Sequence, residues 1–320
     1  MRTGRDVGTG RDVGTGDGGR GTGDVEDGQD LEGVQDVDNR VYVGVDLGAT
    51  NVRAAVVRGS TPEMVQSVAI DAGGSVDDVM NRMYDVIDEV WSDDVAGIGV
   101  GVPSVVDVEK GIVYDVQNIP SMAEVPVKAL LEGRFDRPAF VNNDVNCFVL
   151  GEHGFGKARG YRHVAGCNIG TGFAAGLLID ENLYEGPNCG AGEFGMIPYE
   201  DSILENYCSG LFFIRQGLDA AERRDAAQAG DAEALALWRE FGGHLGKAMQ
   251  IVMYTIDPQI IVLGGSIRRA YDLFQEAMWE ELRRFAYRQT LKRLVFELSD
   301  LEHAALLGAA QLPAKRSVGR

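Results

Sequence analysis

The chain has 320 residues, of which 45% are hydrophobic and 25% are charged. This composition is typical of a globular protein long enough for two domains, and it excludes collagen-like, coiled-coil and wholly disordered chains. With 49 acidic and 30 basic residues, the formal net charge is −19, which repels both nucleic-acid backbone and anionic membrane. Because no cluster of basic residues interrupts this pattern, we expect neither nucleic acid nor a membrane as a partner.

The two acidic residue types and the two basic residue types occur in unequal numbers. Asp outnumbers Glu by 28 to 21, and Arg outnumbers Lys by 24 to 6. A protein of a high-salt cytoplasm and a gene with GC-biased codons both produce this skew, so both explanations stay open. The four cysteines form no CxxC pair, and no apolar run reaches the roughly 20 residues of a membrane span. The N-terminus lacks the apolar core of a secretory signal, and we therefore expect a cytoplasmic protein.

Residues 1–39 differ from the rest of the chain. The hexad TGRDVG starts at Thr3 and again at Thr9, and 11 of the 43 glycines lie in the first 33 residues. Since this segment has almost no large apolar side chains, we predict a disordered Gly/Asp-rich tail over 1–39. An interaction arm or a calcium-binding repeat is the functional alternative, and a dispensable extension is the interpretation that we favour.

The first half of the remaining chain begins with two short apolar runs. Residues 41–45 and 52–57 predict two strands joined by a Gly/Asn turn, which pair most economically as a hairpin. Ser75 is the expected N-cap of an amphipathic helix. Residues 95–102 and 138–141 predict two further buried strands. We predict an N-terminal α/β lobe over residues 40–142.

The second half repeats this order. After an apolar helix that ends near Phe155, residues 165–169 and 176–179 predict two strands flanking Gly170-Thr171-Gly172. A long helix is expected over 232–256 and a buried strand over 259–263. We predict a C-terminal α/β lobe over 143–312 and a tail over 313–320, with a ligand between the two lobes.

Two glycine-containing turns are candidate phosphate sites. In Asp46-Leu47-Gly48-Ala49-Thr50-Asn51-Val52-Arg53, glycine lets backbone approach a phosphate, Thr and Asn supply neutral donors, and Asp46 can hold hydrated magnesium. Gly170-Thr171-Gly172 occupies the same place in the second half. Either turn alone is equally typical of an ordinary hairpin, whereas two facing turns could surround the phosphates of a nucleotide.

Two carboxylates are candidates for chemistry. Asp144 follows a strand and Asn143, so it could accept a proton from a substrate hydroxyl or could simply cap a helix. Glu193 lies between glycines in Ala191-Gly192-Glu193-Phe194-Gly195, where it could serve a ligand or face solvent.

Two other patterns are rejected. Residues 151–157 have the GxxxxGK spacing of a P-loop, but Ala158 replaces the Ser or Thr that binds magnesium and the stretch follows a helix. Residues 170–175 resemble a dinucleotide fingerprint but precede a strand rather than a helix. The four histidines show no metal-ligand spacing.

The residues from Val41 to about Leu312 resemble a sugar kinase of the repressor–ORF–kinase (ROK) family. The resemblance is carried by several motifs in order, namely the two phosphate turns, Val102-Pro103-Ser104 through Asn118-Ile119-Pro120, Asn143-Asp144-Val145-Asn146, Gly190-Ala191-Gly192-Glu193-Phe194-Gly195, Leu204-Glu205-Asn206-Tyr207-Cys208-Ser209-Gly210 and Gly264-Gly265-Ser266. It implies the two-lobed α/β fold of the actin/hexokinase-type ATPases, with ribonuclease H-like lobes.

The resemblance also implies roles for single residues. Asp144 is expected to take the proton from the 6-hydroxyl of a sugar as that hydroxyl attacks the γ-phosphoryl group of ATP. Sugar-binding residues are expected at Asn118, Asn143, Glu193 and Glu205. The residues expected around ATP and Mg²⁺ are Asp46, Gly48, Thr50, Asn51, Thr171, Gly172, Gly264 and Gly265.

One departure from the family pattern concerns the segment after Glu193. Most members have a His followed by a cysteine-rich zinc loop, whereas Met196 stands at the His position here and residues 197–204 contain no cysteine. We therefore expect no structural zinc, and the loss of one sugar contact leaves the identity of the sugar open.

These observations favour an ATP-dependent hexokinase directed at glucose. Kinases for an N-acyl hexosamine, fructose, mannose or allose are the enzymatic alternatives. A sugar-binding regulator without turnover is the other class, although residues 1–39 do not resemble the helix-turn-helix of the family's repressors. A homodimer is the expectation from the family.

Overall fold

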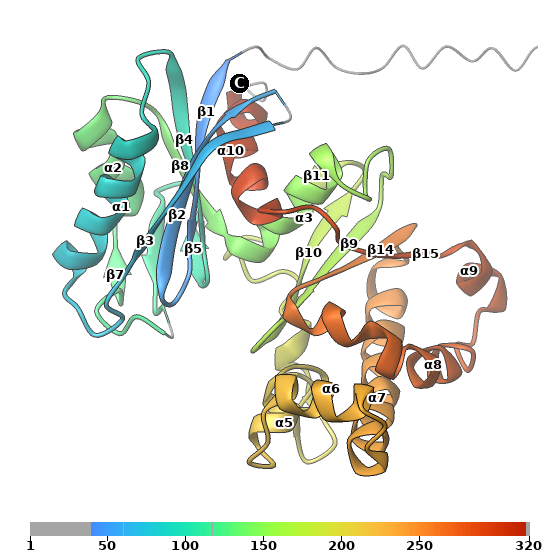
Figure 1. Ribbon diagram of the computed structural model, residues 1–320. Coiled ribbons are helices and arrows are strands. Elements are labelled where there is room, and N and C mark those ends of the chain that lie inside the picture. Colours follow the sequence, from blue (N-terminus) through green and yellow to red (C-terminus); the bar gives the residue numbers. More distant parts are fainter. Residues whose placement is uncertain (1–39, 60, 117, 318–320) are drawn as a thin grey trace, which may run out of the picture. The chain divides into compact units, whose positions relative to one another are not determined.

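The structure, a computed structural model, describes residues 40–59, 61–116 and 118–317. The tail predicted over 1–39 lies outside these residues. The described part contains two five-stranded sheets, and each is covered by helices (Figure 1). This α/β organisation confirms the predicted fold class.

The first sheet has a hairpin at one side and parallel strands at the other. Its strands are β1 (Val41–Leu47), β2 (Asn51–Arg58), β3 (Thr61–Ala69), β4 (Val95–Val102) and β8 (Ala139–Asn143). Their order is β3-β2-β1-β4-β8, with β1 and β2 antiparallel and with β4 parallel to both β1 and β8. The predicted hairpin of the first two strands is confirmed.

The second sheet repeats the same pattern. Its strands are β9 (Val164–Ile169), β10 (Phe173–Ile179), β11 (Asn182–Leu183), β14 (Ile260–Gly264) and β15 (Val295–Leu298). They are ordered β11-β10-β9-β14-β15, again with an antiparallel hairpin next to parallel strands. The carboxyl ends of β1 and β9 are therefore followed by equivalent turns, as the sequence predicts.

Helices cover both faces of the first sheet. The helices α1 (Val76–Val90) and α2 (Val127–Phe135) share one hydrophobic core with Val43 and Val45, whereas α10 (Ala304–Ser317) packs on the opposite face (Figure 1). The predicted cap of α1 is present as a capping box, in which Ser75 Oγ accepts a hydrogen bond from Asp78 N.

The second sheet lies between α3 (Asp144–Phe155) on one face and the helices α7 (Ala232–Ile256) and α8 (Tyr271–Leu282) on the other. The bounds of α7 agree with the long helix predicted from the sequence. The remaining elements are short: β5 (Val105–Asp107), β6 (Ile112–Tyr114), β7 (Glu124–Val125), β12 (Pro198–Tyr199), β13 (Ser202–Ile203), the 3₁₀ helices η1 (Phe194–Met196) and η2 (Ser266–Ala270), α4 (Glu205–Cys208), α5 (Leu211–Ile214), α6 (Ala220–Gln228) and α9 (Arg288–Arg293).

The structure differs from the predicted end of the C-terminal lobe. Residue 312 lies inside α10, which continues through Pro313 to Ser317, and α10 packs against β1 and β4 as well as α3. The last helix of the chain therefore returns to the first sheet. Glycines in the sheet allow this approach, since Gly44 of β1 and Gly99 of β4 leave room for the backbone of α10.

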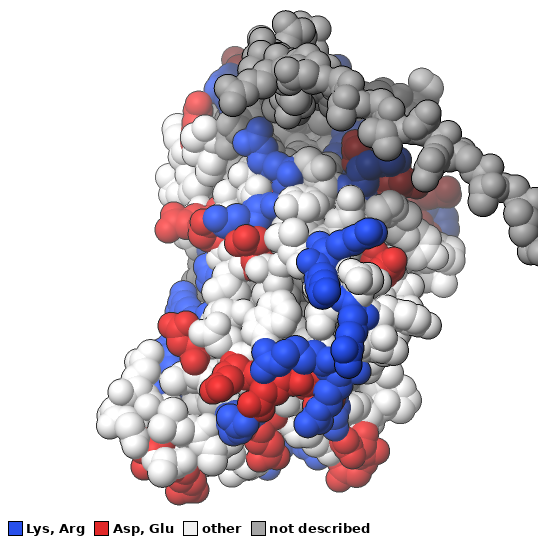
Figure 2. All heavy atoms as spheres, turned by 90° about the vertical axis from the view of Figure 1, so that its right-hand side faces the viewer, with Lys and Arg blue, Asp and Glu red and all other residues white. Residues whose placement is uncertain are grey.

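The surface carries one basic region that the sequence analysis overlooked. Residues 283–293 include Arg283, Arg284, Arg288, Lys292 and Arg293 without an acidic residue, and Figure 2 shows Lys and Arg side chains gathered on the face that carries α9. The acidic composition is therefore not uniform over the surface. Among the residues that the structure describes, no helix is both long and apolar enough to cross a membrane.

Candidate functional site

The turn between β1 and β2 is closed by its own backbone. Gly48 N donates to Asn51 O over 2.9 Å, and Asn51 Nδ2 donates to Thr50 Oγ1 over 2.9 Å. Asp46 lies just before this turn, with its Oδ2 atom 3.5 Å from Arg53 Nη1. The turn thus exposes Thr50, four residues after the carboxylate of Asp46.

The turn between β9 and β10 is held by residues that follow α4. Gly170 N donates to Gly172 O over 3.0 Å, while Gly210 N and Ser209 Oγ each donate to a carbonyl of the turn over 2.8 Å. These contacts leave Thr171 exposed at its tip. The turn is therefore rigidly supported from one side and open at the other.

Gly264 and Gly265 lie beside this second turn. Gly264 pairs with Asn168 at the end of β9. Gly265 has a φ of +80°, and a Cβ there would stand 2.0 Å from Ile169 O. Only glycine fits such a backbone conformation at such a close approach. The glycine pair therefore allows the chain to turn immediately next to the β9–β10 turn.

Asp144 is the first residue of α3, directly after β8. The N-cap of this helix is Asn143, whose Oδ1 atom accepts hydrogen bonds from Val145 N at 2.8 Å and from Asn146 N at 3.4 Å. Asn143 Nδ2 also donates to Ser104 O over 3.2 Å. Asp144 Oδ1 also accepts a hydrogen bond from Val145 N over 2.9 Å, so one oxygen of its carboxylate takes part in the cap beside Asn143.

The pKa of Asp144 is strongly raised. Burial is the main cause, the negative charges of Asp46 and Glu193 add to it, and the pKa rises to about 7. Burial also raises the pKa of Asp46, against the opposing effect of Arg53. Such a shift is common where carboxylates gather at a functional site. It shows that residues from both halves of the chain influence one another electrostatically.

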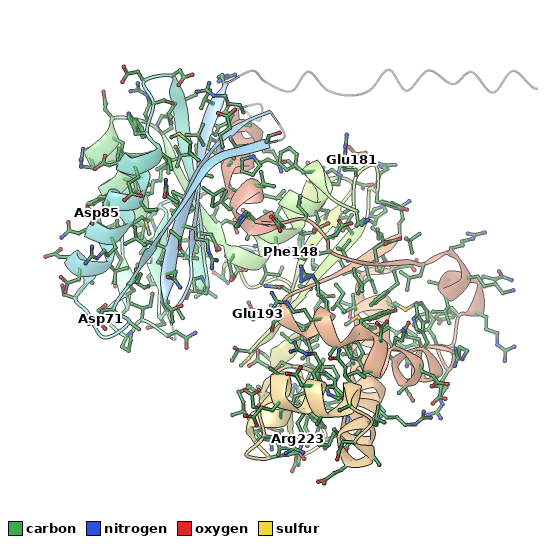
Figure 3. The ribbon with its side chains drawn as sticks, in the orientation of Figure 1. Asp71, Asp85, Phe148, Glu181, Glu193 and Arg223 are labelled. Atoms are coloured by element: carbon green, nitrogen blue, oxygen red, sulfur yellow. The ribbon has the colours of Figure 1, made fainter. Side chains whose placement is uncertain are left out.

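Two further acidic residues, Glu193 and Glu205, belong to the same acidic group. Glu193 precedes η1, and its pKa is raised by burial and then by the charge of Glu205 (Glu193 is labelled in Figure 3). Glu205 Oε2 accepts a hydrogen bond of 2.8 Å from Phe173 N, and a Cβ on Gly172 would meet the same oxygen at 2.6 Å. Glu205 thus links the acidic group to the second turn.

Two residues that the sequence analysis singled out, Asn118 and Met196, are exposed. Asn118 is exposed in the segment between β6 and β7, and no hydrogen bond in the described part of the chain joins it to the other predicted residues. Met196 is also exposed, at 55% of its surface.

Sequence reasoning missed several polar residues near Asp144. The sequence analysis assigned no role to Asn142, Asn146, Glu185 or Cys189. The hydrogen bonds that join them connect residues 43 and 47 positions apart, which no local pattern could indicate.

The donor set is compatible with magnesium bound together with nucleotide. Within residues 40–59, 61–116 and 118–317, no group of three or more His, Cys, Asp or Glu residues could hold a metal ion by itself. Magnesium needs only one or two protein carboxylates when phosphate oxygens and water complete its shell. The half-buried carboxylate of Asp46 fits that requirement, since a cation there would offset its repulsion with Asp144.

Comparison with known proteins identifies the family. The model of the ROK family matches residues 42–316. The chain belongs to the ROK family. A glucokinase from Thermotoga maritima is 28% identical over 312 residues, covering 87% of this chain and 98% of that protein. A putative xylose repressor from a Caldicellulosiruptor species is 27% identical, covering 78% of this chain and 70% of the repressor.

A solved structure shows the same fold. The ROK family glucokinase from Streptomyces griseus, crystallised with glucose and AMPPNP, has a TM-score of 0.73 and 24% identity, and the likeness covers 85% of this chain and 98% of the other. This ROK protein therefore has the two-domain actin/hexokinase-type fold. Its family includes both sugar kinases and repressors.

Proposed function

We propose that this ROK protein is an ATP-dependent sugar kinase that phosphorylates the 6-hydroxyl of a hexose, with glucose as the first candidate. The observation that carries the proposal is the position of Asp144, at the start of α3 and within electrostatic reach of Asp46 and Glu193, with a pKa of about 7. A carboxylate with such a pKa is suited to act as a general base near neutral pH.

In the proposed reaction, Asp144 accepts the proton of the sugar hydroxyl while the hydroxyl oxygen forms a bond to the γ-phosphorus of ATP. The bond between that phosphorus and the oxygen bridging to the β-phosphate breaks, and ADP leaves. Phosphoryl transfer depends mainly on positioning and on neutralising charge, so the protein has little covalent work to do.

The remaining residues would orient the two substrates. Asn143, Glu193 and Glu205 would hold sugar hydroxyls. The turns at Gly48–Asn51 and Gly170–Gly172 would hold the phosphates, and Gly264 with Gly265 would leave room for the adenosine. Asp46 would hold Mg²⁺, which neutralises phosphate charge when it is bound with ATP.

The test is ADP release from Mg-ATP with a panel of hexoses and N-acyl hexosamines, at low and at multimolar KCl. Strong turnover with one sugar would establish the kinase and identify its substrate. If folded protein turned over no sugar at either salt concentration, the kinase assignment would be wrong.

A sugar-binding regulator without turnover is the second candidate, supported by the similarity to a putative xylose repressor. The two candidates differ in their response to Asp144→Ala. A kinase should lose a factor of about 10² to 10⁴ in kcat while it still binds sugar, whereas a regulator should bind sugar as before and have no turnover to lose.

A further inference from the structure

The side chain of Asn142 is the centre of a buried hydrogen-bond network at the end of β8. Its Oδ1 atom accepts from Asn143 N at 2.8 Å, from Asn146 Nδ2 at 2.9 Å and from Cys189 Sγ at 3.2 Å. Its Nδ2 atom donates to Glu185 Oε2 over 2.6 Å. Both ends of the amide are used, and the side chain is only 1% exposed.

The partners of Asn142 come from two separate parts of the chain. Asn146 belongs to the first turn of α3, two residues after Asp144. Glu185 and Cys189 belong to the segment that follows β11 of the second sheet. Cys189 is nonetheless buried in the hydrophobic core of the first sheet, with a φ of +54°. The network therefore fastens a segment of the second half to the strand that precedes Asp144.

The same segment continues to Glu193 and is fixed there as well. Ala191 N donates to Glu185 O over 3.2 Å, and Ala175 N of β10 donates to Gly192 O over 2.9 Å. Gly192 has a φ of +93°, and a Cβ there would stand 1.7 Å from Ala175 O. These contacts restrict the backbone between the network and Glu193, which directly follows Gly192.

We propose that Asn142 is a positioning residue that sets the placement of Glu193 relative to Asp144, through its amide contacts to Glu185 and Cys189. The inference rests on the sugar-kinase function proposed above. Asn142 touches neither reacting atoms nor substrate in this scheme. Its amide joins the start of α3, which carries the proposed base Asp144, to the loop that carries the proposed sugar-binding residue Glu193.

The chemistry of the amide explains why Asn is required. Aspartate at this position would lack the Nδ2 donor and would face the carboxylate of Glu185. Alanine would remove all the hydrogen bonds that the Oδ1 and Nδ2 atoms of Asn142 make, and losing hydrogen bonds between buried polar groups is costly. At Glu185, glutamine can still accept the hydrogen bond from Asn142, whereas leucine cannot.

The experiment compares Asn142→Ala, Glu185→Gln and Glu185→Leu in the full chain, using the sugar that the panel identifies. Asn142→Ala and Glu185→Leu should raise KM for the sugar by about tenfold or more and lower kcat, while KM for ATP changes by less than about twofold. Glu185→Gln should stay within about threefold of the wild type. Asn182→Ala is the matched control, because the side chain of this exposed residue donates to Asp180 O and, in the described part of the chain, has no hydrogen bond to the network.

A pH profile separates positioning from general loss of structure. The charge of Glu193 helps to raise the pKa of Asp144. Displacing Glu193 should therefore move the acid limb of the kcat/KM profile to lower pH in Asn142→Ala, but not in Asn182→Ala. The proposal is overturned if both KM values change together, if Glu185→Gln is as impaired as Glu185→Leu, or if the acid limb stays in place.

Hydrogen–deuterium exchange keeps the test independent of the proposed function. If the wild type turns over no sugar, the kinase assignment fails, but the network still predicts faster amide exchange over residues 184–196 in Asn142→Ala and Glu185→Leu than in Glu185→Gln or the wild type. Equal exchange in all four proteins would refute the positioning role by itself.

Discussion

The environment of Asp144 determines which protonation state the candidate site holds near neutral pH. Three buried or half-buried carboxylates influence one another there, and burial is the main reason why the pKa of Asp144 rises from 3.8 to about 7. An ordinary exposed aspartate would be ionised at every pH at which an enzyme normally works. Asp144 instead titrates within the working range.

The pH dependence of turnover follows from this. We expect kcat/KM for the sugar to increase with pH and to level off above about pH 7, since in the proposed reaction only ionised Asp144 can accept the hydroxyl proton. Initial rates between pH 5 and pH 9, at low sugar concentration and saturating Mg-ATP, check this expectation. A profile that is flat down to about pH 5 would mean that the base has an ordinary pKa.

The same shift has a consequence for stability. Because the folded-state pKa of Asp144 lies above its unfolded value, the folded protein holds a proton that the unfolded chain releases, and the free energy of unfolding falls as pH rises from 3.8 towards about 7. Asp144→Asn removes this loss. At pH 8 the variant should be more stable than the wild type by about 1 kcal/mol or more.

Urea unfolding at pH 8 and at pH 4.5 measures this effect. The stabilisation by Asp144→Asn should be much smaller at the lower pH, where Asp144 is protonated in the folded protein. Equal stabilisation at both pH values would show that it comes from the amide itself and not from the charge.

At the level of elements, the crossing of α3 and α10 depends on glycine. A Cβ at Gly308 of α10 would stand 1.7 Å from Cys147 O of α3, and one at Gly151 would stand 2.0 Å from Ala304 O. The two helix backbones therefore lie nearly in contact. Since α3 begins at Asp144 and α10 also packs on the first sheet, this crossing holds the helix that carries Asp144 against that sheet.

Two glycine substitutions test the importance of this crossing. Gly308→Ala should lower the free energy of unfolding by about 2 kcal/mol, because the added methyl group must displace backbone. Gly133 of α2 is the matched control, since nothing lies within 4 Å of its added Cβ. Gly133→Ala should raise stability by about 0.5–1 kcal/mol through its better helix propensity. Equal effects at the two positions in denaturant titrations would contradict the tight crossing.

At the scale of the whole molecule, the net charge of −19 is the dominant feature. Mutual repulsion among the acidic residues destabilises the folded chain, and added salt screens that repulsion. The basic region around α9 reduces this repulsion only locally. In the part that the structure describes, Arg284 pairs with a carboxylate, whereas the other four cations of the region form no ion pair.

We therefore expect the melting temperature to rise steadily with KCl from low ionic strength into the molar range. Differential scanning fluorimetry measures the shift, with sucrose as a non-ionic control for general solute effects. A melting temperature that falls or stays constant with KCl would show that charge repulsion does not limit stability.

The two β-hairpins, the capping box at Ser75 and the helix Ala232–Ile256 could be predicted from the sequence, because each depends on hydrophobic periodicity or on residues a few positions apart. The ordered motifs likewise indicated the ROK family, which the match over residues 42–316 confirms. Strand β3 was not predicted, since all of its residues are exposed or half-buried and it lacks the buried apolar run of the other predicted strands.

How distant segments meet depends on packing that no local pattern of residues indicates. The return of α10 to the first sheet depends on close approaches at Gly44 and Gly99, which no periodicity reveals. The network around Asn142 joins residues more than 40 positions apart. The raised pKa of Asp144 depends on burial and on charges brought from Asp46 and Glu193. Local residue patterns thus suffice for the local elements and the family, whereas the chemistry available at the site depends on burial and long-range contacts, which arise only on packing.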